Sequence, residues 1–453
     1  MNKRIFALLL SVWMLLSFAA CADTLSAPSS SSSSIPPVFD PSTVGHTVYG
    51  EGFGINPGRV SWAQDPALFD WTNTQYWWDE SNFNTELAAQ MVSDSLCAIA
   101  GTSNEADAWD ALFKDLNLRR YEKNVGHTAG EKIAIKLNMN AVSSDTLATN
   151  AIFPTPCMLR ALLSSMVLHG GVCPEDIVLY DVTRVIPTYF KEYIGKDELA
   201  GVQYVYLGSA PNLKDDDALV VWSSEVVGDD AYLPTCVSEA TYIINYANMK
   251  MHTLAGFTVT TKNHFGSIVT DVNPNRAPAT AGLHELICAT QAIYSGKTIY
   301  PRPYGSYTPM VDIIANQDVG QKTLLYFVDA VVTTAGQNAT LTQAMRWETM
   351  GNQFPCSIFM SQDPIAIDSV CLDFLLSEPN MKIVAEAPMD NYLIEAATVP
   401  NPPSDTVYKD GHGNPITESL GVHEHWYDAK SKEYSRNKGA DVGIELIKIL
   451  YRE

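Results

Sequence analysis

Short apolar runs that end in a polar residue recur along this chain and constrain its fold more than any other feature. Such runs lead into Asn138, Asp181, Asn245, Asp329 and Asp363. Segments with helical periodicity lie between several of them, and a strand–helix–strand order favours parallel strands joined by right-handed crossovers. In sheets of this kind, ligands bind at the carboxyl ends of the strands. We therefore expect an α/β fold in one large body, with a mostly parallel or mixed sheet flanked by helices.

The periodicity of apolar residues places the individual elements. Helices begin where a capping residue precedes an apolar stripe, and short apolar runs between turn residues indicate strands. We expect helices over residues 84–99, 105–116, 155–169, 281–294, 364–376 and 440–451. We expect strands over residues 132–137, 177–180, 202–207, 218–222, 241–245, 323–332 and 357–360.

The first residues have the form of an export signal. Lys3 and Arg4 make a basic start, residues 5–18 are apolar, and small residues precede Cys21. This pattern is typical of a bacterial lipoprotein signal, with residues 1–20 removed and Cys21 carrying the lipid. The alternative is a plain signal peptide that is cut near the same place.

Residues 21–44 are rich in serine and proline, including six consecutive serines at 29–34, and such a segment behaves as a flexible tether. We therefore expect a lipidated tether followed by a single domain over residues 45–453. The predicted location is the cell envelope, on the periplasmic side or the outer surface, with the membrane contacted through the lipid anchor alone.

The charge of the chain is strongly negative. Its 29 lysines and arginines are set against 51 acidic residues, which gives a net charge of −22. This balance argues against nucleic acid or an anionic membrane face as a partner. It also makes any local cluster of positive charge more informative.

The cysteines carry little information about the fold. A body with 46% hydrophobic residues needs no disulfide framework, and the eight cysteines are widely spaced. Most of them are expected to be small buried residues. Cys157 and Cys173 form the pair that we expect to be bridged, if any pair is.

A local cluster of positively charged residues, which stands out in this acidic chain, follows the run Tyr242-Ile243-Ile244. It contains Lys250, His252, Lys262, Asn263 and His264. Burying these groups beside a strand costs several kcal/mol unless they are paired. We expect them to bind a small anionic ligand, with Lys262 as an anchor or base and His252 as an acid–base catalyst. The alternative is a hydrogen-bonded core histidine and a surface lysine.

A second donor set lies at the end of the strand expected over residues 132–137. Lys136, Asn138 and Asn140 alternate, so their side chains share one face of an extended segment. They could bind a phosphate or carboxylate, with Asp181 as an orienting or metal-binding carboxylate. The alternative is a lysine paired with a nearby acid and asparagines that cap a turn.

A third pattern suggests a metal. His423-Glu424-His425 places two histidines on one face of an extended segment. With Asp329 and Asp363 they form our predicted ligand set for a divalent ion such as zinc, iron or nickel. A solvated loop is the alternative for the histidines, and capping of the following helix is a sufficient structural role for Asp363.

Two features of the N-terminal part allow other functions. Trp62, Trp71, Trp77 and Trp78 could stack on sugars, although such clusters more often belong to a core. The glycine-rich loop Gly50–Arg59 could bind an anion through backbone N–H groups, but it has no phosphate-binding lysine motif. A non-catalytic surface protein that binds a glycan or a partner is therefore an alternative function.

Four motifs, in order, resemble those of the domain-of-unknown-function family 362 (DUF362). They are a strand that ends in lysine-x-asparagine, the helix after it, the lysine-x-histidine … lysine-asparagine-x-phenylalanine-glycine signature, and a late Asp-Pro-x-Ala-x-Asp motif. Here they are Glu131–Asn138, Thr155–Gly171, Lys250–Gly266 and Asp363–Asp368. The resemblance implies no general activity. Some members carry ferredoxin-like iron–sulfur modules, and because this chain has no C-x-x-C, we expect no such cluster.

A shorter resemblance implies specific roles for two of these residues. His252 to Lys262 reads H-x-x-A-G-x5-K, which is similar to nickel-pincer lactate racemases. There the lysine holds the pincer nucleotide and the histidine does acid–base work. This sequence departs from that pattern because Val259-Thr260-Thr261 replaces the glycine run before the lysine. We therefore expect an exported lipoprotein with a polar cleft for a small anionic ligand, and a metal- or cofactor-dependent enzyme is one function that such a cleft would serve.

Overall fold

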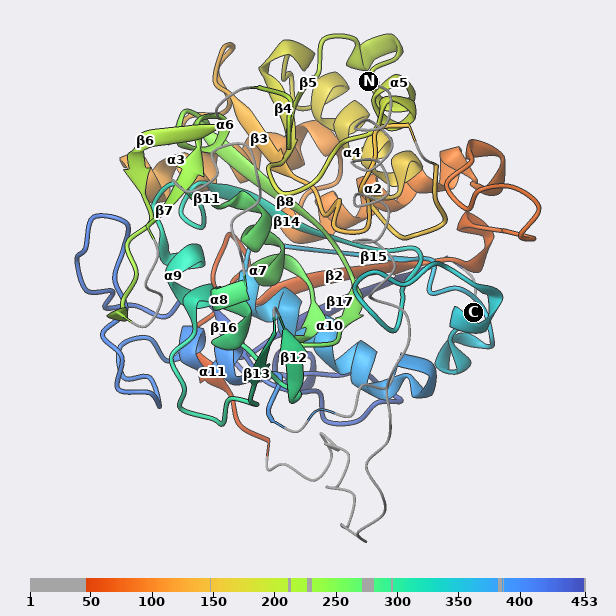
Figure 1. The fold of residues 1–453 in the computed structure, drawn as a ribbon. Coiled ribbons are helices and arrows are strands. Elements are labelled where there is room, and N and C mark those ends of the chain that lie inside the picture. The colour runs from red at the N-terminus through yellow and green to blue at the C-terminus, as the bar shows by residue number, and fades with distance from the viewer. Residues whose placement is uncertain are drawn as a thin grey trace, which may run out of the picture. The chain divides into compact units, whose positions relative to one another are not determined.

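The centre of the fold is an eight-stranded mixed sheet, seen in a computed structural model (Figure 1). The structure describes residues 46–146, 148–210, 213–225, 230–270, 281–294, 296–381, 385 and 387–451. The strand order is β17 (Glu445–Leu450), β2 (Arg59–Gln64), β15 (Ser357–Ser361), β14 (Thr323–Ala330), β8 (Tyr242–Asn248), β3 (Ile133–Lys136), β4 (Ile177–Asp181) and β5 (Gln203–Tyr206). The described residues all belong to one compact unit.

Strands β14, β8, β3, β4 and β5 form a parallel block, and β15 runs antiparallel to both β14 and β2. The chain passes from β3 through β4 to β5 on one side and later returns to β8 on the other side of β3. The boundary between β3 and β8 is therefore a switch point, where the crevice outside the carboxyl ends of the strands commonly holds a ligand.

The central strands are apolar on both faces because both faces are covered. Every residue of β8 and β14 is buried. One face packs against α2 (Thr85–Ala100), α3 (Glu105–Tyr121) and α4 (Pro156–Leu168) in one apolar core. The other face packs against α9 (Pro309–Ala315), α10 (Pro364–Ser377) and α11 (Asn391–Ala397) in a second core. The predicted α/β architecture is confirmed.

Short elements complete the fold. The other helices are α5 (Thr188–Ile194), α6 (Thr235–Ser238), α7 (Thr260–Asn263) and α8 (Ala281–Glu285). β9 (Lys250–His252) and β10 (Gly256–Thr258) form a hairpin, and β1 (Tyr49–Gly50) pairs with β16 (Val422–His423). Two further small sheets contain β6 (Lys214–Leu219), β7 (Ala231–Pro234) and β11 (Val269–Thr270), and β12 (Ala292–Tyr294) and β13 (Lys297–Ile299).

Two expected helices are wrong. The segment 440–451 contains the strand β17, which pairs in parallel with β2 at the edge of the large sheet. In Glu445–Leu450 only Leu446 is buried, so sheet pairing outweighed a short helical pattern. The segment 281–294 is helical only as far as Glu285, and its end pairs with β13 as β12.

Cys157 and Cys173 are both free, so the expected bridge is also wrong. Burial of the Cys157 thiol raises its pKa to about 12, which fits a small apolar core residue. The predicted signal, the lipidated Cys21 and the tether lie outside the described residues. Among those residues, no helix combines the length and apolar character that a membrane crossing requires.

Candidate functional site

A polar cavity of about 170 Å³ lies at the carboxyl ends of β3, β4 and β8. It is the place where the switch point of the sheet predicts a ligand. Most of the residues expected to bind a ligand line it, namely Lys136, Asn138, Asp181, Lys250, His252, Lys262 and Asn263. His264 does not belong to the lining. The lining also includes Arg184 and His284, which the sequence did not single out.

Lys136 and Asp181 meet because they end neighbouring parallel strands. The Lys136 ammonium lies 3.3 Å from a carboxylate oxygen of Asp181, and both side chains are buried. Burial lowers the pKa of Lys136, and Asp181 opposes that shift. The backbone of Gly266 approaches this pair so closely that a Cβ there would lie 2.6 Å from the Lys136 nitrogen. The last glycine of the family signature therefore makes room for the ion pair.

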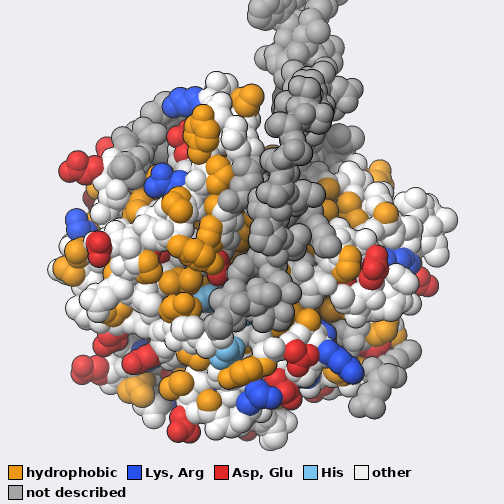
Figure 2. Space-filling view, turned by 90° about the horizontal axis from the view of Figure 1, so that it is seen from below, with side chains coloured by type: hydrophobic (Ala, Val, Ile, Leu, Met, Phe, Trp, Pro, Cys, Tyr) orange, Lys and Arg blue, Asp and Glu red, His pale blue; other side chains and the backbone are white. Residues whose placement is uncertain are grey.

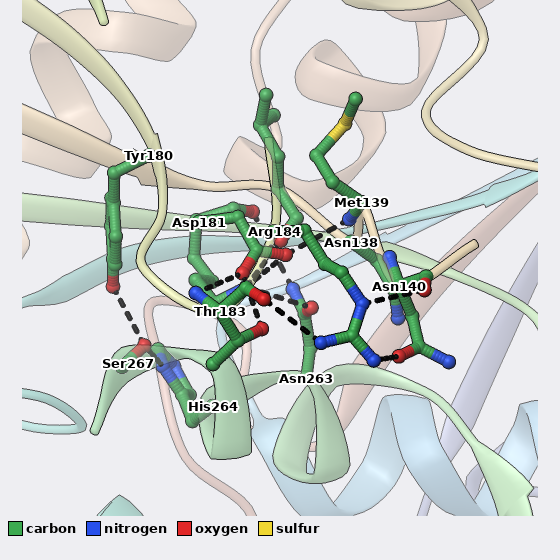
Figure 3. A network of polar contacts seen from close by, with 12 residues as sticks. Asn138, Met139, Asn140, Tyr180, Asp181, Thr183, Arg184, Asn263, His264 and Ser267 are labelled. Carbon is green, nitrogen blue, oxygen red and sulfur yellow. Dashed lines mark hydrogen bonds and ion pairs between the residues drawn. The ribbon is translucent and has the colours of Figure 1, made fainter. Parts of the chain in front are cut away.

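Asp181 also organises the loops that follow β3 and β4 (Figure 3). Its carboxylate accepts hydrogen bonds from the backbone nitrogen of Met139 at 2.9 Å and from the nitrogen and hydroxyl of Thr183. Asp181 thus joins Lys136 to the backbone of the loops after β3 and β4.

Arg184 brings a further positive charge to the cavity. Its guanidinium donates to the carbonyl and the side-chain oxygen of Asn140 at 2.7 and 2.6 Å, as Figure 3 shows. Asn140 therefore lines the cavity and also positions the Arg184 guanidinium. The sequence signal for Arg184 was its place three residues after the strand-ending Asp181.

Lys250 and Lys262 are the unusual members of the site. Lys250 donates to Asn138 at 3.1 Å, and the Lys262 ammonium lies 4.1 Å above the ring of Phe265. Among the described residues, neither lysine has a carboxylate within ion-pair distance. Burial and, to a smaller extent, the neighbouring positive groups lower the pKa of each to about 7, and for Lys250 the carboxylate of Asp181 partly opposes that shift.

His252 is held in one protonation state by its backbone. Its Nδ1 accepts hydrogen bonds from the nitrogens of Leu254 and Ala255 at 3.1 and 3.2 Å. Nδ1 is therefore unprotonated, and a neutral ring carries its proton on Nε2. Burial, followed by the charge of Lys262, holds the pKa of His252 well below its usual value. The ring thus acts as a neutral donor through Nε2–H.

The two remaining residues of the signature have structural contacts. The Asn263 amide donates to Asn245 at 2.9 Å and accepts from Lys136 at 3.4 Å, which ties α7 to β8 and β3. His264 is buried with its Nδ1 at 3.0 Å from the Ser267 hydroxyl (Figure 3). Burial lowers the pKa of His264 to about 3, so it is a neutral core residue. Its expected ligand-binding role is not supported by its position.

A small group of positive charges lies in the interior. On the face seen in Figure 2, basic side chains are dispersed, and acidic side chains lie beside several of them. The cavity, by contrast, contains Lys136, Arg184, Lys250 and Lys262 against the single carboxylate of Asp181. Against a net charge of −22, this local excess requires a specific arrangement of the chain.

Among the described residues, the structure groups the predicted ligands His423 and His425 with neither Asp329 nor Asp363. The Asp329 carboxylate accepts from the nitrogen and hydroxyl of Thr155 and from the hydroxyl of Tyr246. Asp363 caps α10 and also accepts from the backbone of Phe53 and Val422. Both carboxylates are thus used by backbone and hydroxyl donors.

His423 and His425 converge with Asp390 instead. One ligand atom from each of these three residues lies within 4.8 Å of the others, an arrangement compatible with a divalent metal. Asp390 was not predicted, because it lies 33 and 35 residues before the histidines and has no local motif.

The alternative sites in the N-terminal part are not built as ligand surfaces. Trp71 and Trp77 are fully buried and Trp62 nearly so, which leaves only Trp78 partly exposed between Tyr76 and Tyr189. In the loop Gly50–Arg59, the nitrogens of Phe53 and Ile55 donate to Asp363 and Gln362. The loop therefore binds an anionic group of its own chain.

The structure therefore defines a mixed α/β protein with a cationic cavity at the switch point of its sheet. The model of a family described as "Domain of unknown function (DUF362)" matches residues 133–373, and the chain belongs to this family. The match begins in β3 and ends in α10, so it includes every element that builds the cavity.

The apoprotein of lactate racemase from Thermoanaerobacterium thermosaccharolyticum is a weakly similar solved structure. It aligns with a TM-score of 0.34 and 14% sequence identity over 73% of this chain and 62% of that chain. This chain therefore spans less than two thirds of the racemase. No curated protein matches the sequence.

Proposed function

We propose that this protein binds a small anionic ligand, of the carboxylate or phosphate type, in the cavity at the ends of β3, β4 and β8. The observation that carries the proposal is the pair Lys250 and Lys262. Both ammonium groups are buried at one cavity and lack a carboxylate partner among the described residues. Buried charges are normally paired, so a ligand that supplies negative charge would complete the site.

The chemistry of the lining supports acid–base catalysis on such a ligand. A lysine whose pKa is near 7 can hold or release a proton at neutral pH. His252 presents Nε2–H as a neutral donor, which suits a carbonyl or carboxylate oxygen. In this proposal Lys262 moves the proton, His252 polarises the bound oxygen, and Lys250 and Arg184 hold the anion.

We also propose that the protein is exported and lipid-anchored through Cys21, which would place the cavity in the cell envelope. Its support is the signal-like start and the serine-rich segment before the domain. The proposed function further includes a divalent metal at His423 and His425. Neither histidine belongs to the lining of the cavity.

Ligand binding can be tested by thermal unfolding of the purified protein in a panel of anions. The panel would contain phosphate, acetate, malonate and citrate at constant ionic strength, with chloride as the reference. We expect one class to raise the melting temperature saturably, because a ligand that binds the native state stabilises it.

The same panel on Lys262→Ala should show no saturable effect, whereas the exposed-lysine control Lys430→Ala should behave like the unchanged protein. Equal responses of the two variants, or no anion-specific response at all, would contradict the proposed function.

A further inference from the structure

We infer that Asp390, His423 and His425 form a complete three-ligand site for a divalent transition metal, with zinc as the first candidate. The ion would fasten the β1–β16 segment to α10 and α11. The inference deepens the metal part of the proposed function and is independent of the anion cavity.

The ligand atoms already face one another. Oδ2 of Asp390 lies 3.4 Å from Nε2 of His425 and 3.8 Å from Nε2 of His423. With metal–ligand bonds of about 2.0–2.2 Å, two ligands of a tetrahedral zinc are about 3.3–3.6 Å apart. These two separations lie in or just above that range, and all three ligand atoms lie within 4.8 Å of one another, so inward movements of the side chains would close the site.

The other nitrogen of His423 is fixed by a hydrogen bond. Nδ1 lies 2.8 Å from the Ser369 hydroxyl oxygen, and that hydroxyl donates its own hydrogen to the carbonyl of Ile365 at 2.6 Å. The serine oxygen must therefore accept from Nδ1–H. This assignment leaves the lone pair of a neutral His423 on Nε2, the atom that faces Asp390.

His425 is oriented by a carboxylate in the same way. Its Nδ1 lies 2.5 Å from Oδ1 of Asp373, while Oδ2 of Asp373 accepts from the Trp426 nitrogen and the Tyr434 hydroxyl at 2.9 and 3.0 Å. A carboxylate behind a histidine that offers Nε2 in front is the arrangement that commonly orients metal-binding histidines.

Asp390 completes the pattern. Its Oδ1 accepts a hydrogen bond from the Tyr304 hydroxyl at 2.6 Å, which leaves Oδ2 to face the histidines. Each of the three residues thus has its outer atom held by the chain and its inner atom directed at the other two. Asp390 and His423 are buried, so two imidazole nitrogens and a carboxylate oxygen converge where solvent is scarce. A metal ion bound by all three atoms would balance the buried carboxylate.

The donors indicate the class of metal. Two imidazole nitrogens and one carboxylate oxygen suit zinc or iron, whereas calcium and magnesium prefer oxygen ligands alone. Three protein ligands leave a fourth position for water or another small ligand.

The site joins elements that are distant in sequence. His423 lies on β16 and pairs with Tyr49 of β1, and Asp390 immediately precedes α11. The orienting residues Ser369 and Asp373 both lie on α10. An ion bound here would therefore stabilise the packing of these elements, because it binds only the folded arrangement.

The competing occupant is a proton, which would make His425 an imidazolium between Asp373 and Asp390. Elemental analysis of full-length protein, purified without a metal-chelating tag, distinguishes a bound metal ion from a bound proton. We expect one equivalent of zinc or iron. For protein stripped with a chelator, we expect calorimetric titration with Zn²⁺ to show one saturable site and a higher melting temperature.

Matched variants localise the ion. Asp390→Asn and His423→Gln should abolish the bound equivalent, and Ser369→Ala should weaken Zn²⁺ binding by about 10–100-fold through loss of orientation. His412→Gln, at an exposed histidine elsewhere, should leave the metal content and the Zn²⁺ affinity unchanged. Lys262→Ala should also retain the metal, which separates this inference from the anion site.

Protein that contains no metal and shows no saturable Zn²⁺ binding would overturn the inference in favour of the proton. Binding that persists equally in folded Asp390→Asn and His423→Gln would overturn the assigned ligands. Circular dichroism on each variant establishes that it is folded before its metal content is compared.

Discussion

The carboxylate of Asp368 on α10 accepts hydrogen bonds from both the backbone nitrogen and the hydroxyl of Thr260, at 2.9 and 2.6 Å. Its second oxygen accepts from the nitrogen of Thr261 and the hydroxyl of Tyr392. Thr260 begins α7, the short helix that carries Lys262. The late Asp-Pro-x-Ala-x-Asp motif and the lysine of the signature are thus parts of one structure, in which Asp368 is a positioning residue.

Substitution of Asp368 should therefore affect stability and ligand binding together. Asp368→Asn replaces an acceptor with an amide donor that faces Thr260 or Thr261, and an unsatisfied buried group costs about 1–3 kcal/mol. We expect that loss in denaturant unfolding and a weaker response to the anion that stabilises the unchanged protein. Asp441→Asn, at an exposed position before β17, is the control. A folded Asp368→Asn protein with unchanged stability would refute the positioning role.

Lys262→Met should separate stability from function. Methionine keeps much of the lysine stem but removes a buried charge without a described carboxylate partner. We expect the ligand-free protein to gain on the order of 1 kcal/mol in unfolding free energy while ligand binding is lost. Denaturant unfolding with and without the anion measures both effects. A variant that is less stable than the unchanged protein would show that the contact of Lys262 with Phe265 outweighs the cost of burying its charge.

Anion affinity should fall as the pH rises through neutrality. The pKa values of Lys250 and Lys262 are about 7, so both lose their charge above that pH. Lys136, Arg184, His252, His284 and Asp181 are the other ionisable groups of the described lining. Each lysine that must be protonated weakens binding by up to about tenfold per pH unit above its pKa. Calorimetric titrations from pH 6 to 9 would test this, and affinity that rises with pH would contradict it.

The stability of the ligand-free protein should rise with pH over a range in which the anion affinity falls. Between about pH 7 and 10.5 the unfolded chain keeps the two lysines protonated while the folded state releases those protons. Because the unfolded state binds more protons, the lysines' contribution to unfolding free energy rises with pH in this window. Comparison with Lys262→Met isolates the contribution of one lysine, and identical pH profiles for the two proteins would count against the lowered pKa.

Gly266→Ala tests the space beside the ion pair. The added Cβ would lie 2.6 Å from the Lys136 nitrogen and 3.1 Å from an oxygen of Asp181, so the pair must move. We expect a loss of about 1–3 kcal/mol in unfolding free energy, as for other overpacked sites. Gly336→Ala is the matched control, since nothing lies within 4 Å of its added Cβ. Equal stabilities of the two variants would show that Lys136 and Asp181 relax freely.

Much of the fold is predictable because the central strands are buried on both faces. β3, β4, β8 and β14 therefore stand out as apolar runs, and polar residues such as Asp181 mark their carboxyl ends. The edge strand β17 is different, because it buries only Leu446 and has no such run. Its strand conformation follows from pairing with β2, which no local pattern reveals.

Some residues of the candidate site can be recognised in the sequence, and others only in the folded structure. The signature residues Lys250 and Lys262 are recognisable because positive groups directly follow a buried strand. Asp390 is not, because three-dimensional packing alone brings it to His423 and His425. The neutral form of His252 is also beyond the sequence, since it depends on two backbone nitrogens in the turn after β9.

The most direct test of the anion site is anomalous diffraction from crystals of the protein soaked in selenate, an analogue of sulfate and phosphate with a strong selenium signal. We predict an anomalous peak in the cavity, within hydrogen-bond distance of Lys250 or Lys262, that is lost in Lys262→Ala crystals. Selenate peaks elsewhere on the protein, together with an empty cavity at saturating concentration, would contradict the account.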